Sequence, residues 1–387
     1  MSNLYLHTDE LQFDFKKDVG CTDAIFLLSE TVDYFRSRGS SIFAAALDFK
    51  KAFDRINYYK LFSSLIKAGF PNWIIAVFLN WYGKLRVAVR WKSALSSFFA
   101  VKSGVRQGSS FSPAMFNIFI NCFISEIRSN KSGCTINSSF LGIIMYADDL
   151  LLLSASVSGL QQMLNCCDSM SSCLELEFNC KKCTCAVIGS ASQYTISDMK
   201  LGRENISWSQ TFKYLGITFV AGNYLSVDSN IIKRKFFAAS NCILGNVNCL
   251  NDLIKLSLME SFCLPILLYA TVAFKLSNAQ INELNAGWNS IYRRIFGFHR
   301  WESVRCFING IGRLDLAHLR IYQQLKFVKK CLSSQNSTLV SLMMIHINCA
   351  DFTLLCSKVG ILSLDFAYVS RFSLGKLKSL VQLSFAA

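Results

Sequence analysis

Tyr146-Ala147-Asp148-Asp149-Leu150 is the stretch on which the fold of this chain depends. It lies between two short apolar runs, residues 140–145 and 150–153. Short apolar runs bounded by small polar residues predict a buried β-hairpin. Two adjacent carboxylates at its turn repel each other and lose hydration, which is costly unless a positive charge compensates. Mg²⁺ binds carboxylate oxygens and is a natural compensator, so we expect another aspartate on a neighbouring strand.

A second apolar run supplies that acid. Residues 41–47 contain no polar break after Ser41, which predicts a buried strand, and Asp48 follows at its end. Asp48 and the pair Asp148-Asp149 suggest a phosphoryl-transfer site in which two metal ions, about 4 Å apart, hold the attacking and leaving oxygens. Chance placement of three acids is the alternative.

Size and charge indicate the kind of protein. The chain has 387 residues, which favours two or more subdomains, and 52% of them are hydrophobic, enough for a large core. Lys and Arg number 40 against 25 Asp and Glu, a net charge of +15. Such a surplus indicates a polyanionic partner, most simply nucleic acid, with an unspecialised basic surface as the alternative.

The cysteines and the apolar segments indicate the compartment. Sixteen cysteines are scattered along the chain, and its polar start does not resemble a signal peptide, so we expect reduced thiols in the cytoplasm or nucleus. Cys180-x-x-Cys183-x-Cys185 lacks a nearby fourth ligand for zinc. The apolar stretch 262–274 contains Pro265 and is shorter than the ~20 residues that span a bilayer, so it predicts a buried core helix and no membrane partner.

The remaining elements follow from periodicity and caps. Thr22-Asp23 is expected to cap a helix that ends at Gly39. Residues 86–91 alternate polar and apolar, which predicts a half-exposed strand with Arg86 and Arg90 on one face, turned to a phosphate backbone or simply to water. The segment 211–219 is strand-like with a central glycine. Helices are expected over residues 57–69, 71–81, 112–128 and 160–170, and, in an almost wholly helical second half, over 231–245, 252–274, 277–296 and 314–332. The predicted domains are 1–222 and 223–387.

The loop 103–113 is unusual in composition. Gly104 and Gly108 surround Arg106-Gln107, which predicts a tight turn, and Ser112-Pro113 opens the next helix. A glycine-framed glutamine can approach a base or sugar closely; a turn without function is the alternative.

The motifs together resemble one family. Tyr146-Ala147-Asp148-Asp149 resembles the signature box of reverse transcriptases, and residues 47–56 resemble their first aspartate motif in non-long-terminal-repeat (LINE-type) retrotransposons. The similarity to this family runs from about Gln12 to Phe219, in the same order as the family's landmarks, and more weakly through 292–297. The other landmarks are residues 104–119, Asn179-x-x-Lys182 and Phe212-Lys213-Tyr214-Leu215-Gly216.

The resemblance implies an α+β right-hand polymerase, with an antiparallel-sheet palm and helical fingers in residues 1–222 and an all-α thumb and C-terminal extension in 223–387. It implies an RNA-directed DNA polymerase that adds deoxynucleotides to a primer 3′ end, with an RNA template, a DNA primer and dNTPs as partners.

The resemblance also implies roles for individual residues. Two Mg²⁺ ions, with Mn²⁺ as a substitute, would be held by Asp48, Asp148 and Asp149. Lys182 would donate a proton near the leaving phosphates. The implied nucleotide-binding residues are Phe53 (a steric gate against a ribose 2′-OH), Gln107, Gly108 and Lys16, and the implied primer grip is Lys213, Tyr214, Leu215 and Gly216. Asp54 is expected to be structural.

Departures from the family pattern define the alternatives. In the finger segment 12–16, Asp14 stands where the family has glycine and Lys16 where it has the arginine expected to touch the triphosphate. Only eleven residues precede this segment, which indicates an N-terminally truncated piece of a retroelement protein. The alternative function is a catalytically silent relic that only binds nucleic acid. A group II intron-type enzyme is a weaker possibility, and an RNA-dependent RNA polymerase is disfavoured by Ala147 and Phe53.

Overall fold

The computed structural model describes residues 8–386 except 107, 110, 194–195, 248, 270 and 360–372. It divides into two compact units. Unit 1 comprises Met1–Ala24, Thr31–Leu215 and Ala221–Tyr224, and unit 2 comprises Ile25–Glu30, Gly216–Val220 and Leu225–Ala387. The chain passes between the units several times, among them at Leu215-Gly216, and each unit is described separately below.

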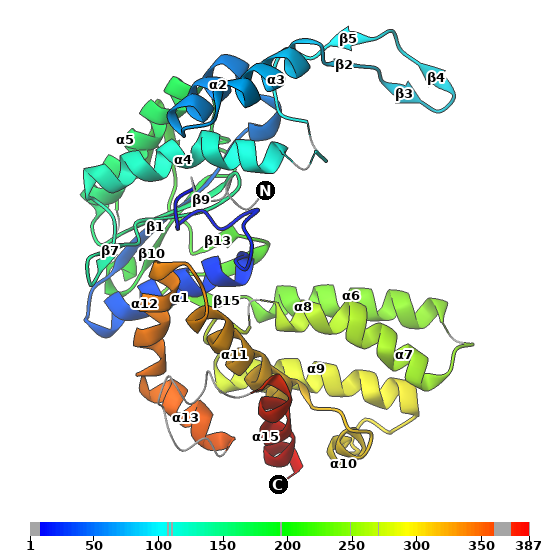
Figure 1. Ribbon diagram of the computed structural model, residues 1–387. Coiled ribbons are helices and arrows are strands. Elements are labelled where there is room, and N and C mark those ends of the chain that lie inside the picture. The colour runs from blue at the N-terminus through cyan, green and yellow to red at the C-terminus, as the bar shows by residue number, and fades with distance from the viewer. Residues whose placement is uncertain are drawn as a thin grey trace. The chain divides into compact units, whose positions relative to one another are not determined.

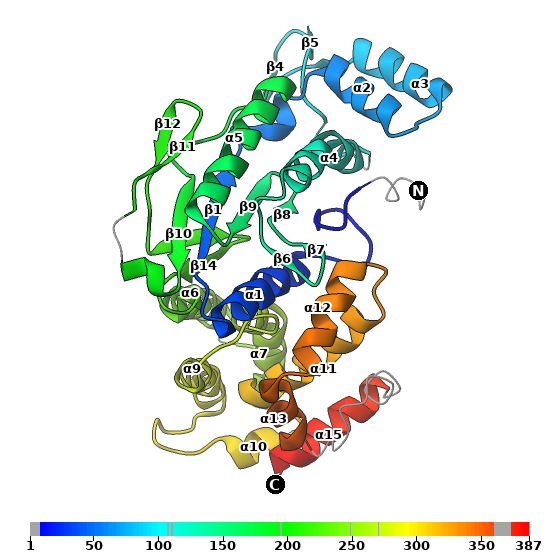
Figure 2. The same ribbon diagram turned by 90° about the vertical axis from the view of Figure 1, so that its left-hand side faces the viewer.

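A four-stranded antiparallel sheet with the order β10-β1-β9-β8 forms the centre of unit 1 (Figures 1 and 2). The central strand β1 (Ile42–Asp48) is buried over its first six residues, as its uninterrupted apolar run predicts. The small side chains of Ala44, Ala45 and Ala46 leave room for covering elements to approach closely. The other strands are β8 (Ile143–Tyr146), β9 (Asp149–Ser154) and β10 (Thr184–Ile188).

Two helices cover this sheet and lie against each other, α4 (Ser112–Asn130) and α5 (Val157–Leu174) (Figure 1). Pro113 occupies the first turn of α4, where its missing N–H costs no hydrogen bond. Ser156 caps α5 by accepting a hydrogen bond from the N–H of Gly159 at 3.0 Å. The buried side chains of both helices, among them Phe119, Phe123 and Met163, form the core that fixes the sheet.

The remaining elements of unit 1 are short. A segment ending at Gly20 leads into α1 (Cys21–Ser37), whose residues Ile25–Glu30 cluster with unit 2. After β1 come η2 (Ala52–Asp54), α2 (Tyr58–Lys67), α3 (Asn72–Gly83) and four two-residue strands, β2 (Arg86–Val87), β3 (Arg90–Trp91), β4 (Ala94–Leu95) and β5 (Phe99–Ala100). The others are β6 (Thr135–Ile136), β7 (Ser139–Phe140), η3 (Ser190–Gln193), β11 (Met199–Leu201), β12 (Glu204–Ile206) and β13 (Thr211–Tyr214).

Unit 2 is mainly helical. Its core is built around Trp288 and Tyr292 of α9 and Phe236 of α6, all fully buried. Ser277 caps α9 with a 3.2 Å hydrogen bond from the N–H of Gln280, and Gly297 ends the helix in the left-handed conformation. The elements are β14 (Ile217–Val220), β15 (Ser226–Val227), α6 (Ser229–Asn246), α7 (Asp252–Leu258), η4 (Met259–Cys263), α8 (Leu264–Leu268), α9 (Asn278–Phe296), α10 (Arg305–Gly310), α11 (Leu316–Leu332), α12 (Ser337–Ile347), α13 (Ala350–Lys358) and α15 (Leu374–Ala386).

Two predicted helix boundaries are wrong. The first helix begins at Cys21, because Asp23 at its third position accepts a hydrogen bond from the N–H of Gly20 at 2.8 Å and Gly20 is the cap. The helix predicted over 252–274 is divided into α7, the π-helical turn η4 and α8, and it ends at Leu268. Pro265 has no N–H to donate to the carbonyl four residues earlier, so the helix widens before it. Phe262, predicted within a buried helix, is 63% exposed.

Two predicted strands are also corrected. The single strand expected over 86–91 is two separate strands, β2 and β3, because β2 pairs with β5 and β3 pairs with β4. The segment 211–219 is divided at Leu215-Gly216, where both residues have positive φ angles, 48° and 75°. The turn that Gly216 allows therefore ends β13 at Tyr214.

Among the described residues, no single helix combines the length and the hydropathy needed to cross a bilayer. A bent pair, Ser337–Ile347 with Phe352–Lys358, passes the same test by length and composition alone.

Candidate active site

Three charged residues form a row across the end of the central sheet. Asp48, the last residue of β1, is the direct partner of Asp149, the first residue of β9. On the other side of β1, the last pair with β10 is Ala46 with Thr184, and Lys182 lies in the turn just before that strand. Directly opposed residues of antiparallel strands point to the same face of the sheet. The sequence prediction that Asp48 lies beside the Asp148-Asp149 hairpin is therefore met in the backbone pairing.

The hairpin that carries the acid pair has a tight turn. Tyr146 pairs with Asp149, so Ala147 and Asp148 are the two residues of the loop. Ala147 has a φ of 51°, a left-handed conformation that costs a residue with a Cβ atom free energy. Its side chain is buried, with 6% exposed, so a bulkier residue would add crowding to this strain. The turn holds Asp148 and Asp149 at the end of the strands.

A loop tethered to the end of β1 supplies Lys182. The N–H of Asn179 donates to the carbonyl of Asp48 at 2.7 Å, and the N–H of Lys182 donates to the carbonyl of Asn179 at 2.8 Å. The Lys182 ammonium, Nζ, lies 3.3 Å from Asp48 Oδ2. This is an ion-pair contact without hydrogen-bond geometry, so Asp48 Oδ2 is buried without a hydrogen-bond donor. Because the Lys182 side chain is 66% exposed, the pair contributes at most about 1 kcal/mol to stability.

The folded protein disfavours the ionised state of the two hairpin carboxylates. Burial raises the pKa of Asp149 to about 6, with further increases from the charges of Asp148 and Asp48 and an opposing effect from Lys182. The pKa of Asp148 is also raised, first by burial and then by the charge of Asp48. The three acids thus lie close enough to repel one another, and Lys182 compensates only in part.

This electrostatic imbalance suits a hard divalent cation. Asp48 offers a buried oxygen without a hydrogen-bond donor, and the two hairpin acids offer only oxygen ligands, the type that Mg²⁺ and Mn²⁺ prefer. Among the described residues, no three metal-binding side chains are already arranged around one point. The residues fit the ions in chemistry and in strand register.

A buried polar network connects the hairpin to the segment before α1. The segment before α1 runs beside β8: the N–H of Phe13 donates to the carbonyl of Met145 and the N–H of Met145 donates to the carbonyl of Leu11, both at 2.9 Å. The fully buried side chain of Gln12 accepts hydrogen bonds at Oε1 from the N–H groups of Ala147 and Asp14, each at 3.3 Å. Gln12 therefore connects the finger segment to the turn that carries the acid pair.

Asp14 and Asn117 extend this network. Asn117, fully buried in α4, donates from Nδ2 to the carbonyl of Asp14 at 2.7 Å. Burial raises the pKa of Asp14, while hydrogen bonds from the backbone of Phe15 and the side chain of Tyr146 lower it and the charge of Asp148 raises it further. The aspartate that stands where the family has glycine thus contacts the acid-bearing hairpin at Tyr146.

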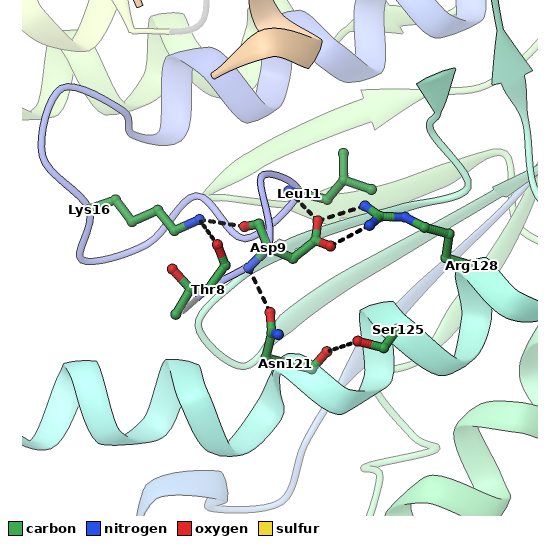
Figure 3. A network of polar contacts seen from close by, with 7 residues as sticks. All are labelled: Thr8, Asp9, Leu11, Lys16, Asn121, Ser125 and Arg128. Atoms are coloured by element: carbon green, nitrogen blue, oxygen red, sulfur yellow. Dashed lines mark hydrogen bonds and ion pairs between the residues drawn. The ribbon is translucent and has the colours of Figure 1, made fainter. Parts of the chain in front are cut away.

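The residues just before the finger segment are anchored on α4 (Figure 3). Arg128 forms a two-pronged contact with the Asp9 carboxylate, at 2.7 and 2.6 Å, and the N–H of Asp9 donates to Asn121 Oδ1 at 2.7 Å. Lys16 donates from Nζ to the carbonyls of Thr8, at 3.3 Å, and Asp9. Burial lowers the pKa of Lys16 to about 8. In this arrangement the Lys16 ammonium is bound to the residues just before the finger segment, and its predicted contact with a triphosphate stays a prediction.

Phe53 and the glycine-rich loop lie together. The half-buried ring of Phe53 stacks on Phe116 of α4, with centroids 4.2 Å apart and an interplanar angle of 20°. The N–H of Val105 donates to the carbonyl of Phe53 at 2.8 Å, and the N–H of Gly104 donates to the carbonyl of Ile56 at 2.9 Å. A Cβ atom on Gly104 would lie 2.7 Å from the carbonyl oxygen of Asp54, so this close approach requires glycine. Asp54 is thus a backbone partner of the loop, in line with a structural role.

The other predicted residues are dispersed. Gly108 is exposed with a φ of 84°, and Gln107 lies outside the described residues. Lys213 is exposed, whereas Tyr214 is 3% exposed and donates from its hydroxyl to the carbonyl of Ile144 at 3.3 Å. The Tyr214 ring therefore belongs to the core beneath β8. The residues of this motif that remain candidates for a primer contact are Lys213 and the turn at Leu215-Gly216, and this contact stays a prediction.

Sequence reasoning assigned no role to Gln12 or Asn117. The available signal was a strongly polar side chain within an apolar stretch, Leu11-Gln12-Phe13 and the run 115–120 around Asn117. Buried amides of this kind need partners, which makes them candidates for a polar network.

An antiparallel sheet with carboxylates at the ends of two adjacent strands, a neighbouring lysine and covering helices is the arrangement expected of a palm-type nucleic-acid polymerase. Residues 2–219 match the family model described as "Reverse transcriptase (RNA-dependent DNA polymerase)". The chain belongs to this family, whose members have the right-hand polymerase fold and are nucleotidyltransferases.

Several proteins of mobile elements are similar to the chain. It is 25% identical over 277 residues to the Pol polyprotein of the type-1 retrotransposable element R2 from Nasonia vitripennis, covering 68% of this chain and 26% of that protein. It is 24% identical over 263 residues to the RNA-directed DNA polymerase from the mobile element jockey of Drosophila melanogaster, covering 65% and 28%. It is 24% identical over 225 residues to an uncharacterized protein of transposon TX1 from Xenopus laevis, covering 57% and 16%.

These relatives confirm the predicted resemblance to the reverse transcriptase domain of non-LTR, LINE-type elements. The chain spans 16% to 28% of the length of these three relatives. Among solved structures, telomerase from Candida albicans in complex with a TWJ fragment of telomeric RNA is similar with a TM-score of 0.42 and 12% identity, covering 94% of this chain and 55% of that one.

Proposed function

We propose that this chain is an RNA-directed DNA polymerase, adding deoxynucleotides to a primer 3′ end on an RNA template. The observation that carries the proposal is that Asp149 of β9 pairs with Asp48 of β1 and that Lys182, in the turn before β10, lies beside Asp48. The family match over residues 2–219 supports the reaction class. RNA template, DNA primer and dNTPs are the proposed partners.

Asp48, Asp148 and Asp149 would hold two divalent ions, Mg²⁺ or Mn²⁺. When bound, such ions lower the pKa of the primer 3′-OH and neutralise the charge of the triphosphate and of the leaving pyrophosphate. The protein's part is to keep three acids together despite their repulsion, which the strand pairing and the Gln12 network support. Lys182, which lies beside Asp48 and is mostly exposed, would donate a proton to the leaving phosphate oxygen.

The remaining residues would bind the reactants. Phe53, fixed by its stacking on Phe116, would exclude a ribose 2′-OH. Gln107 and Gly108 would contact the incoming nucleotide and template, and Lys16 would reach the triphosphate after release from the carbonyls of Thr8 and Asp9. The primer grip would comprise Lys213 with the backbone of Tyr214, Leu215 and Gly216.

Primer extension tests the proposal. The chain is incubated with poly(rA)/oligo(dT), dTTP and Mg²⁺, beside its Asp148→Asn variant. Extension by the parent that is lost in the variant supports the polymerase. An exposed-surface variant, Asp198→Asn, serves as the matched control and should extend as the parent does, because Asp198 is exposed and is not among the residues proposed to bind metal, nucleotide or primer.

The second candidate function is nucleic-acid binding without catalysis. It is favoured by one observation, the engagement of Lys16 with the residues just before the finger segment, which leaves the predicted triphosphate contact unmade. Under this alternative, neither parent nor Asp148→Asn extends the primer, while both bind the template-primer with equal affinity and show equal thermal stability.

A further inference from the structure

An exposed arm projects from unit 1 between α3 and the glycine-rich loop (Figure 1). We define the arm as residues 84–102, which include β2, β3, β4 and β5. Every residue from 89 to 100 is exposed. Two short ladders join the sides of the arm, Arg86-Val87 with Phe99-Ala100 and Arg90-Trp91 with Ala94-Leu95. The N–H of Val101 also donates to the carbonyl of Leu85, and the N–H of Ser96 to the carbonyl of Val89. A two-stranded ribbon of this kind has little core of its own and is marginally stable without a partner.

The charge of the arm has one sign. Between Asp54 and Glu126 the chain contains no Asp or Glu. None of the arm's cations forms an ion pair among the described contacts, and all are exposed; they are Lys84, Arg86, Arg90, Lys92 and Lys102. A cationic ribbon without acidic residues attracts a polyanion. It has no negative charges to pair with the basic residues of a protein surface that carries both signs, so binding to such a surface is less favourable.

The same arm exposes aromatic rings. Trp91 is 75% exposed, Phe98 66% and Phe99 49%. None of the three rings contacts another ring within the described part of the chain. Large rings left free in water beside arginines are typical of surfaces on which unpaired bases stack.

We propose that the arm binds single-stranded nucleic acid, with Trp91, Phe98 and Phe99 stacking on bases and Arg86 and Arg90 contacting phosphates. A duplex offers phosphates to the cations but no free base faces to the aromatic rings, because its bases are already stacked on one another. A single strand with unpaired bases can bind the cations through its phosphates and the rings through its bases. Stacking tolerates any base, so the arm binds without strong sequence preference. This surface is independent of the acid row, and it stands whether or not the chain extends a primer.

The test measures binding of the full chain to fluorescein-labelled oligo(rU), oligo(dT) and a duplex of equal length, by anisotropy across a salt series. Trp91→Ala and Phe98→Ala should each weaken single-strand binding roughly tenfold and leave duplex binding nearly unchanged. Trp91→Phe keeps a ring and should restore most of the affinity. Trp301→Ala, which removes an 81% exposed tryptophan in unit 2, is the matched control and should bind as the parent does.

The role of charge is tested with Arg86→Gln combined with Arg90→Gln. For a single strand, the salt dependence of the logarithm of the affinity should become shallower by about 0.7 for each phosphate that the variant no longer neutralises. Arg203→Gln with Arg300→Gln removes two exposed arginines outside the arm and is the control. Circular dichroism of each variant shows whether the fold is kept. All binding is measured also in the Asp148→Asn background, so that loss of catalysis and loss of arm binding are separated.

Three results would overturn the proposal. The first is single-strand affinity within twofold of the parent in the folded Trp91→Ala and Phe98→Ala variants. The second is an equal loss of duplex and single-strand binding, which would assign the rings a purely structural role. The third is concentration-dependent self-association of the parent that the same two substitutions abolish without changing nucleic-acid binding, which would mean that a second copy of the chain covers the rings.

Discussion

Gln12 Oε1 accepts a hydrogen bond from the backbone N–H of Ala147 at 3.3 Å, linking the finger segment to the turn of the acid pair. It also accepts the N–H of Asp14 at 3.3 Å. Gln12→Met removes this acceptor from two buried donors, each of which then costs about 1–3 kcal/mol. We expect the free energy of unfolding in urea to fall by about 2–6 kcal/mol, and kcat of primer extension to fall more than KM rises.

Gln323→Met is the control for that substitution, because the side chain of the half-buried Gln323 makes none of the described hydrogen bonds and its replacement should change stability little. An unchanged unfolding free energy in Gln12→Met would show that the Gln12 amide does not support the turn.

Gly104 is expected to tolerate no side chain. Gly104→Ala combines a φ of 87° with a Cβ atom 2.7 Å from the Asp54 carbonyl oxygen, and we expect it to destabilise unit 1 by more than about 2 kcal/mol. Gly69→Ala is the matched comparison, since Gly69 has a φ of 81° but a Cβ atom added there would have no atom within 4 Å. Thermal melting that ranks the two variants equally would contradict the close contact between the loop and Asp54.

Phe53 is expected to determine sugar selectivity. Phe53→Val shortens the side chain and removes the ring that stacks on Phe116, so incorporation of ribonucleotides relative to deoxynucleotides should rise roughly tenfold or more. Phe53→Tyr keeps the ring and should keep the discrimination. The measurement is kcat/KM for dTTP and UTP on the same template-primer, and an unchanged ratio in Phe53→Val would remove Phe53 from the gate.

Asp149 is expected to lower the stability of the folded protein as the pH rises, whereas a salt-bridged acid, whose pKa is lowered, has the opposite effect. Its pKa is raised from 3.8 to about 6, so its ionised form is disfavoured in the folded state above pH 6, and this penalty disappears as the pH falls towards 4. In EDTA at neutral pH, Asp149→Asn should therefore raise the free energy of unfolding, by about 1–2 kcal/mol after allowance for solvent screening. The gain should shrink at low pH.

Metal addition provides the second half of that experiment. Saturating Mg²⁺ should stabilise the parent more than Asp149→Asn, because the variant lacks one proposed ligand. Equal stabilisation of both proteins would argue against Asp149 as a metal ligand.

The fold was most predictable where the pattern was local. The uninterrupted apolar run before Asp48 became β1, and the capping residue Ser277 marked the start of α9. The errors arose where non-local or backbone effects decided. The alternation of residues 86–91 did not reveal that Arg86 and Arg90 pair with different strands, and the hydropathy of 252–274 did not reveal the interruption that Pro265 imposes.

The site was predictable to a similar extent. The acids and Lys182 could be found because each lies at or near the end of a strand. The pairing of β1 with β9 brings Asp48 beside Asp149, and the turn before β10 brings Lys182 beside Asp48. Gln12 and Asn117 act through hydrogen bonds between segments more than a hundred residues apart, and no local pattern encodes such a partner. The burial of Tyr214 likewise follows from its contact with Ile144, which the Phe212–Gly216 motif does not specify.

The register between β1 and β9 has a consequence for how this sequence can change. Side chains alternate between the two faces of a strand with a period of two. Deleting one residue between Leu150 and Ser154 would bring successive β9 residues onto the opposite face unless the pairing slipped, and slippage would separate Asp149 from Asp48. Apolar substitutions in the same strand alter only packing volume. Insertions and deletions are therefore far more damaging here than replacements, so that the lengths of these two strands are under tighter constraint than their composition.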